Sequence, residues 1–302
     1  MSKRLILTGG SGFVAAGIVR AAVQEWEVHA VSRRTAPESL PNLTWHTLNA
    51  EDPDAFHELF HHLEPAAVIH AAAIADIDYC QAHPDEAERV NHMMARDLAE
   101  MCWDHDTRFV FLSTDTVFDG ERGDYIETDP PRPVNCYGET KVRAEQAIRG
   151  FGGNYVIARV ALVMGLPLWG HGNSFVSRMK SVLEAGRQLT VPKDEIRTPI
   201  DVVTLGRALA ELAGNDHRGV IHLSGNDKLN RYDMMVGIAH RLGLPDALIV
   251  RHDPTVIPDR APRPRDASLC NAKAREVLDT PMRNFDEGLE LVLAAAGQGK
   301  RA

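Results

Sequence analysis

Short apolar stretches recur through the first half of the chain, and stretches with the spacing of amphipathic helices separate them. The apolar stretches predict strands at residues 3–8, 27–32, 43–48, 67–70, 108–112 and 155–160. The intervening stretches predict helices at residues 12–24, 54–63, 85–103 and 138–149. Strands that alternate with helices of this length form βαβ units and a parallel sheet. We therefore predict an α/β fold with a doubly wound parallel sheet, which binds ligands beyond the carboxyl ends of its strands.

The second half of the chain is less regular. Turn signals interrupt helical stretches there, and residues 219–223 (GVIHL) read as one more strand. The predicted division is a larger domain at residues 1–165, to which 201–225 return, and a smaller, mostly helical C-terminal lobe at 166–200 and 226–302.

Composition narrows the class of protein. The 302 residues are 44% apolar and 25% charged, which is the profile of an ordinary globular protein. We see no apolar run long enough for a membrane span and no signal peptide, so we expect a cytoplasmic protein without a membrane partner. The net charge of -9 argues against a nucleic-acid partner, which would be bound through its phosphates.

Cysteines and histidines add no metal or disulfide chemistry to this expectation. The four cysteines are scattered without a C-x-x-C pair, so we expect no disulfide framework. His57, His61 and His62 have helical spacing, but no cysteine or carboxylate completes a ligand pattern beside them. We interpret them as a solvated helix face and expect no metal.

A glycine-rich turn follows the first predicted strand and opens the first helix. Residues 8–17 read TGGSGFVAAG, with the spacing Gly9-x-x-Gly12-x-x-Ala15. Glycines let the backbone approach a pyrophosphate, and the helix N-terminus offers free N–H groups. The turn therefore predicts a Rossmann-type dinucleotide site that includes Gly9, Ser11, Gly12, Phe13 and Val14.

The end of the second strand bears on which dinucleotide is bound. Proteins that bind NAD commonly place an acidic residue there, but this chain has Ser32, Arg33 and Arg34. Two guanidinium groups can bind a 2′-phosphate, so we favour NADP(H), with NAD(H) as the other possibility. The alternative is a pair of solvated arginines at a strand end. We also assign Asn49 and Ala50, after the third strand, to the cofactor site.

Two further stretches carry candidate chemistry. Tyr137 and Lys141 are four residues apart and share a helix face, so the ammonium is expected to lower the pKa of the phenol. The fifth strand ends in residues 113–116 (STDT), and we expect Thr114 and Asp115 to face Tyr137. Ser113 and Thr116 are expected to satisfy local backbone groups.

Together these stretches resemble the extended short-chain dehydrogenase/reductase superfamily, and within it the dTDP-4-dehydrorhamnose reductase branch. The resemblance spans nearly the whole chain. It is carried by the following segments: the glycine-rich turn, residues 70–73 (HAAA), Asn91, residues 113–120 (STDTVFDG), residues 137–141 (YGETK), Arg159 with Val163 and Gly165, and residues 263–269 (RPRDASL).

The resemblance implies a role for each matching residue. Tyr137 would donate a proton to a substrate carbonyl, and Lys141 would hold the nicotinamide ribose. Thr114 would hydrogen-bond the reacting oxygen beside Asp115, and Asn91 would support a proton relay through the lysine. Ala71, Ala72 and Ala73 would line the cofactor, and Arg159 would lie near the substrate.

Substrate identity is less certain than reaction type. Many branch members have an aromatic residue at the position of Thr116 and another in the stretch after Arg159, where this chain reads Val160-Ala161-Leu162. Both changes put dTDP-4-dehydrorhamnose itself in doubt. Arg197 and Arg263 are candidates for binding substrate phosphates, and solvated loop arginines are the alternative.

Three functions follow from the resemblance. The favoured one is an NADP(H)-dependent reductase of a nucleotide-linked 4-keto sugar or a similar carbonyl compound. The second is a sugar-nucleotide epimerase or dehydratase that uses NAD. The third is a non-catalytic NADP-binding role like that of the regulatory β subunit of methionine adenosyltransferase. Related proteins often dimerise through the helices equivalent to residues 85–103 and 137–149, so a homodimer is one possibility.

Overall fold

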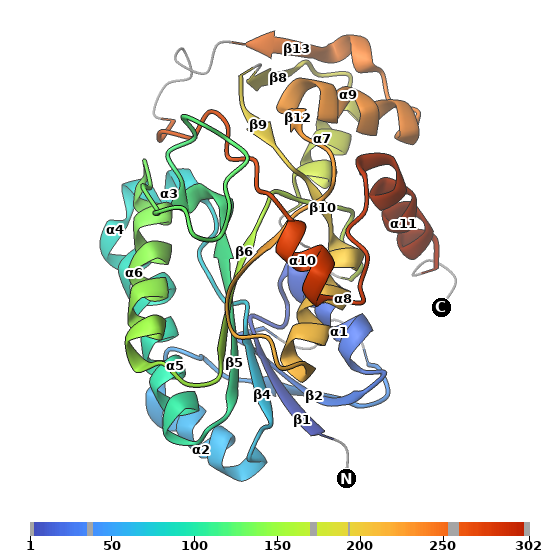
Figure 1. Ribbon diagram of the computed structural model, residues 1–302. Coiled ribbons are helices and arrows are strands. Elements are labelled where there is room, and N and C mark those ends of the chain that lie inside the picture. The colour runs from blue at the N-terminus through green and yellow to red at the C-terminus, as the bar shows by residue number, and fades with distance from the viewer. Residues whose placement is uncertain (1–2, 35–38, 170–173, 193, 253–259, 299–302) are drawn as a thin grey trace.

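A seven-stranded parallel sheet forms the centre of the molecule (Figure 1). The computed structural model describes residues 3–34, 39–169, 174–192, 194–252 and 260–298. In spatial order the strands are β11 (Gly219–Leu223), β6 (Tyr155–Val160), β5 (Arg108–Thr114), β4 (Ala67–His70), β1 (Lys3–Thr8), β2 (Trp26–Ser32) and β3 (Leu43–Thr47). Every pairing between neighbours is parallel, so the predicted fold class is confirmed.

Helices cover both faces of this sheet. The helices α1 (Phe13–Ala22) and α8 (Val202–Gly214) pack on one face, and α2 (Pro53–Leu63), α5 (Met94–Asp104) and α6 (Cys136–Phe151) pack on the other (Figure 1). The crossing of α1 and α8 is backbone to backbone, because a Cβ on Gly206 would lie only 2.2 Å from the carbonyl carbon of Gly17. Each face has its own apolar core, which holds the strand ends in place.

The strand order reverses between β1 and β4. From β1 the chain builds outward through β2 and β3, and it then returns to place β4 on the other side of β1. At such a switch point the connections leave β1 and β4 in opposite directions, which opens a crevice at their carboxyl ends. The glycine-rich turn follows β1, and residues 71–73 follow β4, so both predicted cofactor segments lie at this crevice.

The long helix predicted at residues 85–103 is present and contains a π-helical turn. After the short helix α3 (Ile77–Ala82), it consists of α4 (Pro84–Glu88), a π-helical turn η1 (Arg89–Met93) and α5. Asn91 lies inside the π turn, and its side-chain amide bonds both backbone groups of Ile74. A π turn widens a helix locally and is frequent at functional sites. The apolar spacing of the sequence could not reveal this extra residue in the turn.

The smaller lobe is built from the C-terminal half and packs around a third apolar core. Its helices are α7 (Phe175–Glu184), α9 (Arg231–Leu242) and α11 (Phe285–Gln298), whereas α10 (Ala272–Val277) packs on β11 and the core of the central sheet. Short strands pair as β7 (Val163–Met164) with β10 (Ile200–Asp201), β9 (Ile196–Arg197) with β12 (Leu229–Asn230), and β8 (Leu189–Pro192) with β13 (Ile249–His252). Among the described residues there are also two 3-10 turns, η2 (Asp115–Val117) and η3 (Asp246–Leu248).

Neither a membrane span nor a metal cluster is found in the described part of the chain. Within the described ranges, no helix combines the length and the apolar character that crossing a membrane requires. The same part of the chain holds no cluster of three or more His, Cys, Asp or Glu side chains arranged to bind a metal ion.

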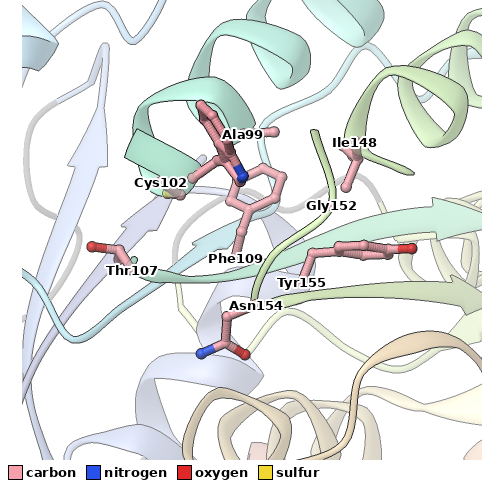
Figure 2. Close-up of a pocket in the computed structure, with 9 residues that line it drawn as sticks. Ala99, Cys102, Thr107, Phe109, Ile148, Gly152, Asn154 and Tyr155 are labelled. Atoms are coloured by element: carbon pink, nitrogen blue, oxygen red, sulfur yellow. The ribbon is translucent and has the colours of Figure 1, made fainter. Parts of the chain in front are cut away.

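Figure 2 shows a cavity of about 10 Å³ between α5, α6 and β5, lined by Phe109, Ile148 and Tyr155 among others. It lies where β5 and β6 begin, at the opposite end of the sheet from Thr114. This volume suits one water molecule and is far too small for a dinucleotide or a sugar. The site must therefore be sought at the carboxyl ends of the strands.

Candidate active site

The glycine-rich turn is shaped as a phosphate cradle. Gly9 has a φ of +70°, and a Cβ there would lie 2.7 Å from the backbone nitrogen of Ala72, so only glycine fits without strain. The N–H of Gly12 donates to the carbonyl of Gly9 at 2.8 Å and closes the turn. Gly12 caps α1 without a side-chain hydrogen bond, which leaves the first N–H groups of Phe13 and Val14 available for an anion.

The end of β2 is tied to this turn. The Ser32 hydroxyl donates to the Ser11 hydroxyl at 2.8 Å and accepts from the N–H of Arg34 at 3.1 Å. Arg33 and Arg34 are both exposed next to the cradle. Both side chains are therefore in solvent, where a ribose phosphate could reach them.

The segment after β4 forms the other wall. The N–H of Ala72 donates to the Thr8 hydroxyl at 3.3 Å, so β1 and the segment of Ala71 and Ala73 are joined. Asn91 is fully buried behind it, where it accepts from the N–H of Ile74 at 2.8 Å and donates to its carbonyl at 3.0 Å. Both amide atoms of Asn91 thus anchor this wall, and its part in a proton relay stays a prediction.

Asn49 and Ala50 line a cavity of about 430 Å³ together with Phe56, Met94 and Leu98. The cavity lies between the segment after β3 and the helices α2 and α5. An apolar wall beside a polar loop is suited to a flat heterocycle. The two residues are thus placed at a hollow next to the crevice.

The carboxyl end of β5 carries three polar side chains in contact with one another. The Thr114 hydroxyl lies 3.0 Å from that of Thr116, accepts from the N–H of Thr116, and donates to the Asp115 carboxylate at 3.2 Å. All three residues are about 95% buried. Burial raises the pKa of Asp115, and the nearby Arg197 guanidinium opposes that shift.

Tyr137 lies in the first turn of α6, whose N-cap Asn135 accepts from the N–H of Gly138 at 2.9 Å. Burial and the Asp115 carboxylate raise the pKa of Tyr137 above its ordinary value, and a hydrogen bond with the Thr114 side chain opposes this shift. The structure thus confirms the expected approach of Thr114 and Asp115 to Tyr137.

The expected lowering of the Tyr137 pKa is wrong, because burial and the Asp115 carboxylate raise it. Lys141 is 2% exposed, and its ammonium lies 4.3 Å from the centre of the Phe111 ring. Burial lowers the pKa of Lys141 to about 7, so its own charge is only partly present at neutrality. Burial and the Asp115 carboxylate govern the pKa of Tyr137, and the phenol stays protonated.

The predicted substrate contact of Arg159 is not supported. The side chain is fully buried, and its Nη2 and Nε atoms donate to Glu145 at 2.7 and 3.0 Å. Its guanidinium also lies over the Phe118 ring at 5.1 Å. Ser113, expected to bond local backbone, instead donates to the same Glu145 carboxylate at 2.6 Å. These groups form a structural ion-pair network beneath the site.

Arg197, on β9, reaches from the smaller lobe to the site, where its Nε lies 3.5 Å from the Asp115 carboxylate. It belongs to a cluster that sequence reasoning missed. Burial and its neighbours Arg197 and Arg260 lower the pKa of Arg231 to about 10. Arg260 is paired with Glu195, and Arg178 also contributes charge. The cluster thus has an excess of positive charge, which suits an anion. Its arginines are Arg178, Arg197, Arg231 and Arg260, and its carboxylates are Asp115 and Glu195.

Arg263 is not available for phosphate in this structure. Its two Nη atoms donate to the two Asp78 carboxylate oxygens at 2.6 and 2.7 Å, a bidentate pair. Asp78 also accepts from the N–H of Ala261, and the Asn135 side chain donates to the carbonyl of Pro262. The predicted phosphate ligand therefore fastens the segment of residues 260–263 to α3 and to the start of α6.

Glu145 is the other residue that sequence reasoning overlooked. It is 1% exposed and lies on the same face of α6 as Tyr137 and Lys141. The sequence does contain a signal for it, because Glu145 follows Lys141 at the same four-residue spacing that separates Lys141 from Tyr137. That spacing would be the same for a glutamate exposed on the helix surface, so it does not show that Glu145 is buried.

Comparisons with known proteins agree with this arrangement. The family model described as RmlD substrate binding domain matches residues 3–297. The β subunit of methionine adenosyltransferase 2 from Bos taurus is 28% identical over 89% of this chain and 80% of its own length. The dTDP-4-dehydrorhamnose reductase of Mycolicibacterium smegmatis is 26% identical over 98% of this chain and 86% of its own.

A solved structure shares the whole fold. It is the dTDP-4-dehydrorhamnose reductase of Bacillus anthracis str. Ames in complex with NADP, with a TM-score of 0.87, 23% identity, and coverage of 97% of this chain and 99% of that one. Together with the family-model match and the relatives named dTDP-4-dehydrorhamnose reductase, the resemblance to that branch is confirmed. Since the family model covers nearly all of the sequence, the chain belongs to the family defined by the RmlD substrate binding domain.

Proposed function

We propose that this chain is an NADP(H)-dependent reductase of a carbonyl compound, and that its substrate is a nucleotide-linked 4-keto sugar. The observation that carries the proposal is the meeting of Thr114, Asp115 and Tyr137 at the carboxyl end of β5, next to an arginine cluster in the smaller lobe. The first three residues can handle a carbonyl oxygen, and the cluster can bind a diphosphate. The family relatives named dTDP-4-dehydrorhamnose reductase support the same reading.

The residues present fit a dinucleotide. Gly9 lacks a Cβ and can therefore lie against the backbone of Ala72. The helix α1 begins without a side-chain cap, so its backbone N–H groups can face a pyrophosphate. Arg33 and Arg34 would hold the 2′-phosphate of NADP, and Lys141 the nicotinamide ribose hydroxyls. When bound, the reduced nicotinamide supplies the hydride.

The chain's own groups would manage the proton. Thr114 would hydrogen-bond the substrate carbonyl oxygen, and Tyr137 would donate its phenolic proton to that oxygen as negative charge develops there. Because the pKa of Tyr137 is raised, the phenol carries its proton throughout the neutral range. It can therefore donate that proton when the substrate carbonyl is reduced. Arg197, with Arg231 and Arg260 behind it, would hold the substrate diphosphate and orient the sugar.

The test is a turnover assay with NADPH or NADH and a panel of 4-keto sugar nucleotides and simple ketones, followed by the absorbance of the reduced nicotinamide. We expect Tyr137→Phe to lower kcat by roughly 10²- to 10⁴-fold, the usual contribution of a general acid. Tyr155→Phe is the matched control, because Tyr155 lines the small cavity at the far end of the sheet. Equal activity of Tyr137→Phe and the wild type would exclude the proposed mechanism.

Cofactor choice has its own test. Arg33→Ala should weaken NADPH binding and leave NADH binding nearly unchanged, because only NADPH carries the 2′-phosphate. Dissociation constants for both nucleotides, measured by fluorescence titration, decide this. An unchanged NADPH/NADH preference would mean that the exposed arginine is simply solvated.

A regulatory role is the second candidate, and the similarity to methionine adenosyltransferase 2 subunit beta favours it. In that case the chain would bind NADP and a methionine adenosyltransferase, and no carbonyl compound would be reduced. Size-exclusion chromatography of the chain mixed with a purified methionine adenosyltransferase catalytic subunit tests this. A complex together with no turnover on the whole panel would favour the regulatory role.

A further inference from the structure

A third ionisable side chain continues the catalytic face of α6. Tyr137, Lys141 and Glu145 are four residues apart and therefore lie on successive turns of one helix face. Glu145 is 1% exposed and Lys141 is 2% exposed, so both charged side chains are withdrawn from water. A buried glutamate needs partners, and the identity of these partners shows what this one does.

The Glu145 carboxylate is held from three directions. The Ser113 hydroxyl on β5 donates at 2.6 Å, Arg159 on β6 donates at 2.7 and 3.0 Å, and Arg149, one turn further along α6, lies at 3.4 Å. These contacts join the strand that ends in Thr114 to the helix that carries Tyr137 in its first turn. The position of the negative charge is consequently well defined.

Lys141 has no such set of partners. Among the residues that the structure describes, no oxygen atom hydrogen-bonds its ammonium, and its contact is with the Phe111 ring. Burial is the main cause that lowers the pKa of Lys141 to about 7, and the Glu145 carboxylate acts in the opposite direction. The charge of the lysine at neutral pH therefore depends on what surrounds it.

The other titratable groups that face Lys141 carry no charge near neutrality. His70, on β4, has a pKa lowered by burial to about 3, and Cys80, on α3, has a pKa raised by burial to about 11. Tyr137, on α6 itself, has a raised pKa and is a neutral phenol. Between pH 5 and pH 9 Glu145 is thus the group whose charge acts on the lysine.

We propose that Glu145 is a positioning residue that keeps Lys141 in its ammonium form and so sets the upper pH limit of cofactor binding. The proposal rests on the proposed function in one respect, which is that Lys141 holds the nicotinamide ribose. The sign follows directly: above its pKa the lysine is neutral, and its hydrogen bonds to hydroxyl groups lose their charge-assisted strength. Removing the Glu145 charge lowers that pKa and moves the loss of affinity to lower pH.

The experiment measures NADP⁺ affinity by isothermal titration calorimetry from pH 5.5 to 9 in the wild type and in Glu145→Gln. We expect the midpoint of the alkaline loss of affinity to fall by about one pH unit or more in the variant. Lys141→Met should abolish this alkaline limb altogether. Titration of the 2′-phosphate of NADP⁺ is common to all variants and cancels in the comparison.

Three variants separate charge from architecture. Glu145→Asp keeps the charge and should retain the wild-type midpoint. Ser113→Ala removes the hydrogen bond from β5 and leaves the carboxylate charged, so its midpoint should also be unchanged. Arg149→Ala removes the exposed partner of the same carboxylate and should not lower the midpoint.

A wild-type midpoint in Glu145→Gln would overturn the proposal. An equal shift in Ser113→Ala would also overturn it, because the hydrogen bond to Glu145 and not its charge would then determine the midpoint. If Glu145→Gln does not fold, Glu145→Gln combined with Arg159→Met takes its place, and its midpoint should be lowered by less, because loss of the Arg159 charge acts in the opposite direction. The reductase assignment is judged separately: wild-type protein that binds NADP⁺ with this pH dependence and turns over no substrate would overturn that assignment alone.

Discussion

The Glu145 carboxylate is shared by two arginines whose environments differ sharply, which allows a matched stability experiment. The Arg159 side chain is fully buried, whereas that of Arg149 is 43% exposed. Arg159→Met leaves a buried carboxylate without its main counter-charge, and such a loss costs about 3–5 kcal/mol of unfolding free energy. Arg149→Ala breaks a pair that water already screens, and its cost should be about 0–1 kcal/mol.

The assay is urea unfolding at pH 7.5, followed by far-UV circular dichroism, with the free energies compared at equal m-values. The double variant Glu145→Gln with Arg159→Met should recover much of the loss, because replacing both partners removes the uncompensated charge. KM for the substrate is measured on the same proteins. This distinguishes a structural arginine from one that contacts the substrate.

One outcome would refute the reasoning. If Arg159→Met unfolds at the wild-type urea concentration and only KM rises, Arg159 contacts the substrate and the buried pair adds nothing to stability. Equal losses in the two arginine variants would likewise show that burial does not govern the strength of these pairs.

Two further predictions concern the cofactor turn and acid stability. Gly9→Ala should lose about 1–2 kcal/mol of unfolding free energy and bind NADPH more weakly, because the φ of +70° and the nearby nitrogen of Ala72 exclude a Cβ. Gly150 is its control, since it lies in a helix with open space around it. Gly150→Ala should gain about 0.5–1 kcal/mol in the same urea assay. His70 and His222 both have a pKa lowered by burial to about 3, so between pH 7 and pH 5 the unfolded chain takes up protons that the folded chain excludes. Unfolding free energy should therefore fall by about 2 kcal/mol per histidine over that range, and a flat dependence on pH in the urea midpoint would contradict the burial of these rings.

Much of the fold could be predicted because its signals are local. The alternation of apolar strands and amphipathic helices determines a parallel sheet, and a glycine-rich turn after β1 can only lie at the carboxyl edge of that sheet. The spacing of Tyr137 and Lys141 placed them on one helix face for the same reason. The π turn around Asn91 escaped prediction, since one extra residue in a turn barely changes the hydrophobic period.

The direction of the Tyr137 pKa was the instructive error. Sequence spacing shows that a lysine lies near a tyrosine, but it does not show how much water either one retains. In the folded chain burial acts on both groups, and it weakens the charge of Lys141 while it suppresses ionisation of the phenol. Only the three-dimensional surroundings decide which of these effects is larger.

The three substrate arginines show where the sequence stops. From the sequence alone, Arg159, Arg197 and Arg263 were equivalent cations near the substrate lobe. In the tertiary structure Arg159 pairs with Glu145 and Arg197 pairs with Asp115 at the site. Arg263 pairs with Asp78. Local periodicity determines which elements form and which faces are apolar, whereas the partner of a charge is chosen among residues distant in sequence. That choice depends on burial and distance, which exist only after the chain has folded.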